Sequence, residues 1–129
     1  MKRKFLPLML LLLLTGCGKS SGTEAAYRQV SMQEAINMMN TQAGYIILDV
    51  RTQEEYETAH IPGAVCVPNE SIGTTPPAQL PDKSQLILVY CRSGNRSKQA
   101  SEKLAKMGYT NVVEFGGIRD WPGETVSGN

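Results

Sequence analysis

The chain is organised around one stretch, Val89-Tyr90-Cys91-Arg92-Ser93-Gly94-Asn95-Arg96-Ser97, which joins an apolar run at residues 86–89 to a helical pattern. A strand–loop–helix unit of this kind directs several backbone N–H groups into one concavity at the positive end of a helix dipole. A thiol at the mouth of that concavity, here Cys91, loses its proton more readily than a free cysteine does. The stretch therefore predicts a nucleophilic cysteine in an anion-binding loop.

Continuously apolar runs alternate with helical patterns along the rest of the chain. Strands are expected at residues 27–30, 45–48, 64–67, 86–89 and 111–115. Runs without polar alternation are typical of strands buried on both faces, as in a parallel sheet. The predicted fold is therefore α/β, with a mostly parallel central sheet of about five strands flanked by helices on both faces. Asp49 and Cys91 follow two of these strands, at the sheet edge where ligands of α/β folds bind.

Capping residues indicate where the helices begin. Ser31 with Glu34, and Thr52 with Glu55, form the S/T-x-x-E pattern that predicts a helix start. After the cysteine loop, apolar residues recur at helical spacing through residues 98–107. Ser97 is expected to cap this last helix.

The composition favours one domain without a polyanionic partner. The chain has 129 residues, and its 13 Lys and Arg nearly balance 12 Asp and Glu. We expect a single domain at residues 27–126, which acts as a monomer. No nucleic-acid partner is expected, because there is no basic excess to attract one.

The first residues have the features of an export signal. A basic segment, residues 2–4, precedes an apolar segment, residues 5–14, that is too short to span a bilayer as a helix. The following Leu14-Thr15-Gly16-Cys17 resembles a bacterial lipobox, in which the cysteine carries a diacylglycerol and becomes the N-terminus. We therefore expect a lipoprotein signal peptide at residues 1–16, and a lipidated Cys17 with a flexible tether at residues 17–26. An ordinary secretory signal with a coincidental cysteine is the alternative.

On the lipoprotein interpretation the domain is exported and anchored to a bacterial membrane, in the periplasm or on the outer face of the cell membrane. Disulfides can form there, yet the two remaining cysteines, Cys66 and Cys91, do not make a disulfide framework. Cys66 is interpreted as a small apolar strand residue. A redox pair of Cys66 with Cys91 stays open, although there is no C-x-x-C motif.

Several separate motifs follow one another in a characteristic order. They are Leu48-Asp49-Val50-Arg51, Glu54-Glu55-Tyr56, His60-Ile61-Pro62-Gly63-Ala64, the Cys91–Ser97 loop, and Gly116-Gly117 with Trp121. Together they span about residues 27–123, and they resemble the single-domain form of the rhodanese family of sulfurtransferases.

The resemblance implies that Cys91 takes the outer sulfur of a small anionic donor such as thiosulfate and passes it, as a persulfide, to cyanide or a thiol. It also implies that the rest of the loop binds the sulfur and the donor, through Arg92, Ser93, Gly94, Asn95, Arg96 and Ser97. Asp49 and Arg51 are expected to support the site rather than to react, and His60 is expected to pack in a turn. The implied chemistry needs no metal and no organic cofactor.

The length of the loop favours sulfur over phosphate. Related phosphatases have Cys-x5-Arg, whereas Cys91 to Arg96 is Cys-x4-Arg, a smaller ring that suits one sulfur atom better than a tetrahedral oxyanion. Two alternatives stay open: a phosphatase or arsenate reductase of related fold, and a non-catalytic rhodanese module for sulfide or redox sensing or for protein binding. The presence of Cys91 disfavours the module, because a binding domain has no use for the nucleophile.

Overall fold

The computed structural model describes residues 26–129. The predicted signal peptide, the lipidated Cys17 and nearly all of the tether lie outside these residues, and they stay predictions. No helix within the described part of the chain is both long and apolar enough to cross a membrane.

The centre of the domain is a five-stranded parallel sheet. Its strands are β1 (Arg28–Gln29), β2 (Ile46–Asp49), β3 (Val65–Cys66), β4 (Ile87–Cys91) and β5 (Val112–Gly117). They lie in the order β1-β5-β4-β2-β3, and every neighbouring pair runs parallel. The predicted α/β fold with about five parallel strands is therefore confirmed. All five residues of the central strand β4 are buried, which explains its continuously apolar sequence.

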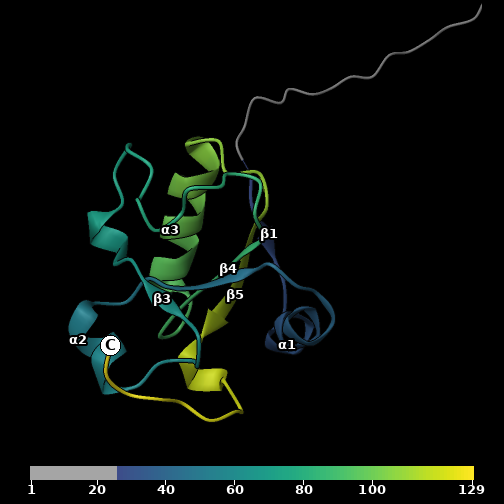
Figure 1. Cartoon of the computed structure of the whole chain (residues 1–129), viewed down its shortest axis with the longest axis vertical. Helices are drawn as coiled ribbons and strands as arrows, with labels where there is room; N and C mark the ends of the chain where they lie inside the picture. Colours follow the sequence, from purple (N-terminus) through teal and green to yellow (C-terminus); the bar gives the residue numbers. More distant parts are fainter. Residues whose placement is uncertain (1–25) are drawn as a thin grey trace, which may run out of the picture.

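Helices cover both faces of the sheet (Figure 1). They are α1 (Met32–Thr41), α2 (Gln53–Thr58) and α3 (Asn95–Lys106), with short 3-10 turns η1 (Asn69–Ser71) and η2 (Ile118–Asp120). The two predicted capping boxes are confirmed. The Ser31 and Thr52 hydroxyls each accept a hydrogen bond from the backbone N–H three residues later, and their own backbone N–H groups donate to the glutamate at that position. Helix α1 ends at Thr41, three residues before Gly44.

Alternation along the strands divides the core into two layers. Val89 and Cys91 pack on the face covered by α3, in the cluster that also holds Leu104. Tyr90, between them, points to the opposite face, where it packs in the cluster that holds Ala35 of α1. Because side chains of a strand alternate between the faces of its sheet, Tyr90 and Cys91 are neighbours in sequence but pack in different layers of the core.

Candidate active site

Cys91 is the last residue of β4 and is only 1% exposed. The Gly94 amide donates a hydrogen bond to its Sγ at 3.0 Å, and the Oγ of Ser97 lies 3.5 Å from the same sulfur. A strand end, a tight loop and the first turn of a helix thus converge on one sulfur atom.

The surroundings of this sulfur favour its ionised form. Burial raises the pKa of the Cys91 thiol, but its hydrogen bonds with the Ser97 side chain and with the amides of Ser97, Gly94 and Ser93 outweigh this effect. The pKa therefore lies below the ordinary value for cysteine. Since the thiolate is the nucleophilic form, the loop can stabilise negative charge on a reactive sulfur.

Gly94 lets the chain pass from β4 into α3 within three residues. Its φ of 113° lies in the left-handed region that favours glycine, and it is the N-cap of α3. The helix therefore begins at Asn95 rather than near Lys98, and the predicted capping role of Ser97 is wrong. Ser97 lies inside the first turn, fully buried, and its hydroxyl faces Cys91 instead of the helix end.

A β-bulge in β5 brings a second glycine against the loop. Val89 pairs with Glu114 but Cys91 pairs with Gly117, so β5 has one more residue than β4 between these pairs. A Cβ atom on Gly117 would lie 1.9 Å from the carbonyl oxygen of Arg92. The backbone of the cysteine loop therefore rests directly on β5, and no larger residue fits at Gly117.

Glu114 is a candidate that sequence analysis missed. It is 3% exposed and lies on β5, beside the α3 face of the sheet. Its Oε2 accepts hydrogen bonds from the Ser97 hydroxyl at 2.5 Å and from the Gly116 amide at 3.0 Å. The available signal was a single charged residue within an apolar strand, because such a charge is rarely buried without a specific partner.

The two arginines of the loop have different surroundings. Arg96 donates two hydrogen bonds to the carboxylate of Glu55 at the start of α2, at 2.7 and 3.2 Å. Arg92 is exposed, and within residues 26–129 no ion pair engages its side chain. Ser93 and Asn95 are also exposed. Arg92 is therefore available to an anionic ligand, whereas Arg96 also fastens α2 to the loop.

The Arg96–Glu55 ion pair should make the free energy of unfolding depend on pH in the acid range. The hydrogen bond from Arg96 is the largest cause that lowers the pKa of Glu55 from 4.5 to about 2. A depressed carboxyl pKa stabilises the fold above the unfolded value, and this contribution is lost as the pH falls toward the folded value. Glu55→Gln should therefore lower the free energy of unfolding near neutral pH, by less than about 1 kcal/mol because both side chains are partly exposed. In urea unfolding the gap should close between pH 4.5 and about 2, and a gap of constant size would contradict this.

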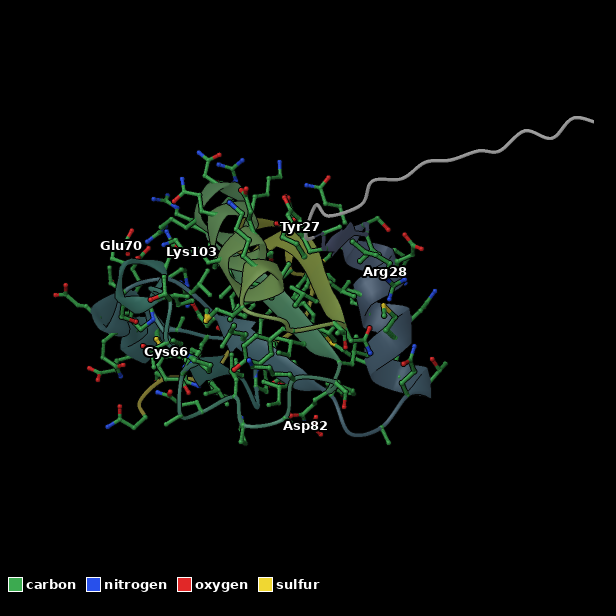
Figure 2. All side chains as sticks on the ribbon, turned by 90° about the horizontal axis from the view of Figure 1, so that it is seen from above. Tyr27, Arg28, Cys66, Glu70, Asp82 and Lys103 are labelled. Carbon is green, nitrogen blue, oxygen red and sulfur yellow. The ribbon has the colours of Figure 1, made fainter. Side chains whose placement is uncertain are left out.

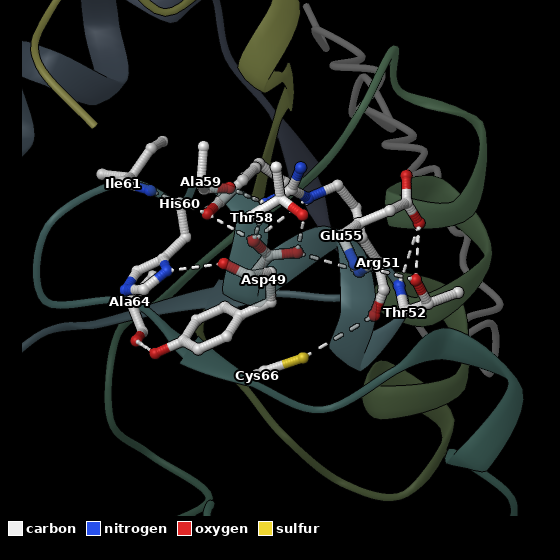
Figure 3. Close-up of polar contacts among 12 residues, drawn as sticks. Asp49, Arg51, Thr52, Glu55, Thr58, Ala59, His60, Ile61, Ala64 and Cys66 are labelled. Carbon is white, nitrogen blue, oxygen red and sulfur yellow. Dashed lines mark hydrogen bonds and ion pairs between the residues drawn. The ribbon is translucent and has the colours of Figure 1, made fainter. Parts of the chain in front are cut away.

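Asp49 and Arg51 lie in a buried network that holds the segment after α2 (Figure 3). The Arg51 guanidinium donates to both carboxylate oxygens of Asp49, at 2.7–3.1 Å, and to the Ala59 carbonyl at 2.6 Å. The Tyr90 hydroxyl donates to Asp49 at 2.6 Å and accepts from the Ile61 amide at 3.1 Å. These contacts join β2 and β4 to the segment at residues 59–61. Asp49 and Arg51 therefore support the sheet beside the cysteine loop.

Tyr90→Phe should measurably destabilise the domain. Tyr90 is fully buried, and its hydroxyl satisfies both a carboxylate and a backbone amide. Removing the hydroxyl takes away the hydrogen bond that it donates to Asp49. We therefore expect a loss of about 2 kcal/mol in the free energy of unfolding. The matched control is Tyr45→Phe, whose hydroxyl donates to a neutral, partly buried carbonyl. If urea unfolding shows a larger loss of unfolding free energy for Tyr45→Phe than for Tyr90→Phe, the result would contradict this interpretation of the network.

Cys66 is too far from Cys91 to form a disulfide. The strand order β4-β2-β3 puts two strand spacings between them, about 10 Å, whereas bridged Cα atoms lie roughly 4–7 Å apart. The two side chains also belong to different core layers, and Figure 2 shows Cys66 toward the end of the molecule opposite Arg28 of β1. Burial raises the pKa of Cys66 to about 11. The fold therefore excludes a Cys66–Cys91 redox pair.

His60 packs in the interior, as predicted, but it lies in an antiparallel bridge with Val126, just before the turn at Pro62 and Gly63. It is 5% exposed and stacks on Tyr56 with ring centroids 3.7 Å apart. Its Nδ1 donates to the Tyr56 carbonyl at 2.8 Å. These contacts hold the ring within the segment after α2.

A surface cavity of about 260 Å³ lies beside the C-terminal half of α3, lined by Gly73, Thr74, Lys103, Lys106 and Met107. Cys91, in contrast, lies at the other end of this helix.

Within residues 26–129, no group of three or more His, Cys, Asp or Glu side chains is arranged to hold a metal ion.

Comparison with known proteins identifies the same family that the order of the motifs indicated. Residues 31–124 match the family model of the rhodanese-like domain. The chain is 40% identical over 73 residues to thiosulfate sulfurtransferase PspE of Escherichia coli, covering 57% of this chain and 70% of PspE. It is 31% identical over 108 residues to thiosulfate sulfurtransferase GlpE of Pseudomonas entomophila, covering 80% and 95%. It is also 34% identical over 107 residues to the putative sulfur carrier protein YrkF of Bacillus subtilis, but spans only 57% of that protein.

Solved structures give the same result for the fold. A rhodanese with anions from E. coli superposes with a TM-score of 0.59 at 38% identity, covering 65% of this chain and 99% of that one. A rhodanese-like domain from Anabaena superposes with a TM-score of 0.69 at 27% identity, covering 79% and 80%. The family model covers strands β2 to β5, the cysteine loop and the glycines that support it, and the chain therefore belongs to the rhodanese family.

Proposed function

We propose that this protein is a sulfurtransferase that carries a sulfane sulfur on Cys91. The observation that carries the proposal is the set of hydrogen-bond donors that meet at the Cys91 Sγ and lower its pKa. Two relatives that bear the name thiosulfate sulfurtransferase, at 40% and 31% identity, support it.

In the first half-reaction, the Cys91 thiolate attacks the outer sulfur of an anionic donor such as thiosulfate. A sulfur–sulfur bond forms at Cys91 as the donor's sulfur–sulfur bond breaks, and sulfite leaves with the electron pair. The negative charge then lies on the outer sulfur of the persulfide. Backbone amides and the N-terminal end of α3 stabilise that charge, as the donors of an oxyanion hole do. The exposed Arg92 attracts the donor to the loop.

In the second half-reaction, a thiophilic acceptor attacks the outer sulfur. Cyanide leaves as thiocyanate and a thiol leaves as a persulfide, and in both cases the electron pair returns to the Cys91 thiolate. The same amides stabilise the thiolate as the leaving group, because they already lower its pKa. One loop therefore serves both halves of the reaction.

The proposed function is tested by supplying both substrates. Reduced protein with thiosulfate and cyanide should form thiocyanate, and it should leave phenyl phosphate and arsenate unchanged. Turnover of phenyl phosphate or arsenate instead would support the phosphatase or arsenate reductase alternative. Absence of any turnover would favour the non-catalytic module.

A further inference from the structure

The interior beneath the cysteine loop contains a chain of three side chains that ends in a carboxylate. The Cys91 thiol donates to the Ser97 Oγ at 3.5 Å, and the Ser97 hydroxyl donates to the Glu114 Oε2 at 2.5 Å. All three residues are 3% exposed or less. Solvent therefore cannot easily take up the proton that Cys91 must lose before it reacts, whereas Glu114 is linked to it through a single hydroxyl.

Ser97 has one hydrogen to donate, and its neighbours compete for it. The carbonyl oxygens of Gly94 and Gly116 lie 3.0 and 3.4 Å away, but the Glu114 carboxylate is nearest. If Cys91 and Glu114 were both ionised, two buried anions would compete for this single proton. Burial of two like charges without a cation is strongly unfavourable.

Few other charges face this cluster. On the strands beside β5, the residues paired with Glu114 are Val89 and Gln29, neither of which is charged. From α3, the charge of Arg96 acts on Cys91, but Arg96 is paired with Glu55 of α2. Within the described residues no ion pair engages Glu114. The described residues thus offer this cluster amide and hydroxyl donors, but no cation in an ion pair with it.

We propose that Cys91 and Glu114 share one proton through Ser97, so that Glu114 receives the proton that Cys91 loses. The Sγ–H bond breaks as a new bond forms to the Ser97 Oγ, and the original Ser97 proton moves to the Glu114 Oε2. Afterwards the neutral Glu114 donates to Ser97, which in turn donates to the Cys91 thiolate. The hydrogen-bond chain reverses direction, no group loses its partner, and the net charge is unchanged.

The inference deepens the proposed sulfur transfer, on which it rests, by assigning Glu114 as the positioning residue that takes up the Cys91 proton. It can be tested without sulfur chemistry, because the thiolate is also the form that iodoacetamide alkylates. Two groups that share a proton lose their protons in two macroscopic steps. Between these steps the thiolate fraction depends only on how the proton divides between Cys91 and Glu114, and not on pH.

The experiment is the pH dependence of Cys91 alkylation, followed by peptide mass spectrometry. Wild type should show two rises separated by a plateau, and Glu114→Gln should show a single rise. Glu102→Gln, which removes an exposed glutamate of α3, is the matched control and should keep both rises. A single rise in wild type, or two rises in Glu114→Gln, would overturn the proposal. Loss of sulfur transfer with an intact two-step profile would instead count against the proposed function alone.

A second measurement needs no variant, in case Glu114→Gln fails to fold. Alkylation of wild type at neutral pH removes the thiolate, so Glu114 no longer needs to hold its proton. The infrared difference spectrum should then lose the carbonyl stretch of a protonated carboxylic acid. A spectrum without this loss would overturn the shared proton, whatever the protein does with thiosulfate.

Discussion

Cys91→Ser should abolish thiocyanate formation while leaving the fold intact. A serine hydroxyl is similar in size to the thiol, and it can accept the same hydrogen bond from the Gly94 amide. It cannot form a persulfide, so both half-reactions lose their covalent intermediate. We expect no activity above the uncatalysed rate, a far larger loss than an indirect effect on the loop would give. The activity is measured by thiocyanate assays, and circular dichroism checks that the variant is folded.

The matched control for Cys91→Ser is Cys66→Ser. Cys66 packs in the opposite core layer, and burial raises the pKa of its thiol to about 11. The variant should therefore keep essentially all of the activity. Thiocyanate formation that survives in Cys91→Ser, or disappears in Cys66→Ser, would place the reactive sulfur elsewhere.

Gly117→Ala should have the next largest effect. Its Cβ would lie 1.9 Å from the Arg92 carbonyl oxygen and 2.6 Å from the Ser93 amide nitrogen, and neither backbone atom can move aside as a flexible side chain would. The loop must shift, and the amides then lose their alignment with the Cys91 sulfur. A displacement of about 1 Å can cost roughly 100-fold in rate. Overpacking should also lower the free energy of unfolding by about 1–3 kcal/mol.

Gly73→Ala is the control for Gly117→Ala. Gly73 is exposed, a Cβ atom added to it would meet no atom within 4 Å, and its φ is outside the left-handed region. Activity and urea unfolding should both stay near wild type. A Gly117→Ala enzyme with wild-type kcat/KM would show that contact with β5 does not position the loop.

Much of the fold could be predicted because its signals are local. The capping boxes at Ser31 and Thr52 depend on residues three positions apart, and the strand β4 is apolar at nearly every position because it is buried on both faces. The motif order then indicated the family, which the comparisons confirm. Cys91 was identified for the same reason, since a thiol between a strand and a helix is a local pattern.

The inner part of the site could not be predicted in this way. Ser97 was taken for a helix cap because serine is a common capping residue, but the left-handed Gly94 starts the helix earlier and turns the Ser97 hydroxyl inward. Glu114 reaches that hydroxyl because β5 pairs with β4, which places Glu114 beside Val89, two residues before Cys91. Contacts of this kind join residues 17 positions apart, and no pattern along the chain shows them. Likewise, only the strand order shows that Cys66 cannot reach Cys91.

The most direct test of the central claim is the intact mass of the reduced protein after incubation with thiosulfate alone. Wild type should gain the mass of one sulfur atom, located at Cys91 by peptide mapping, and should lose it again when cyanide is added. Cys91→Ser should gain nothing. A wild-type protein whose mass does not change, or that carries the added sulfur on Cys66, would contradict the proposal that Cys91 is the sulfur carrier.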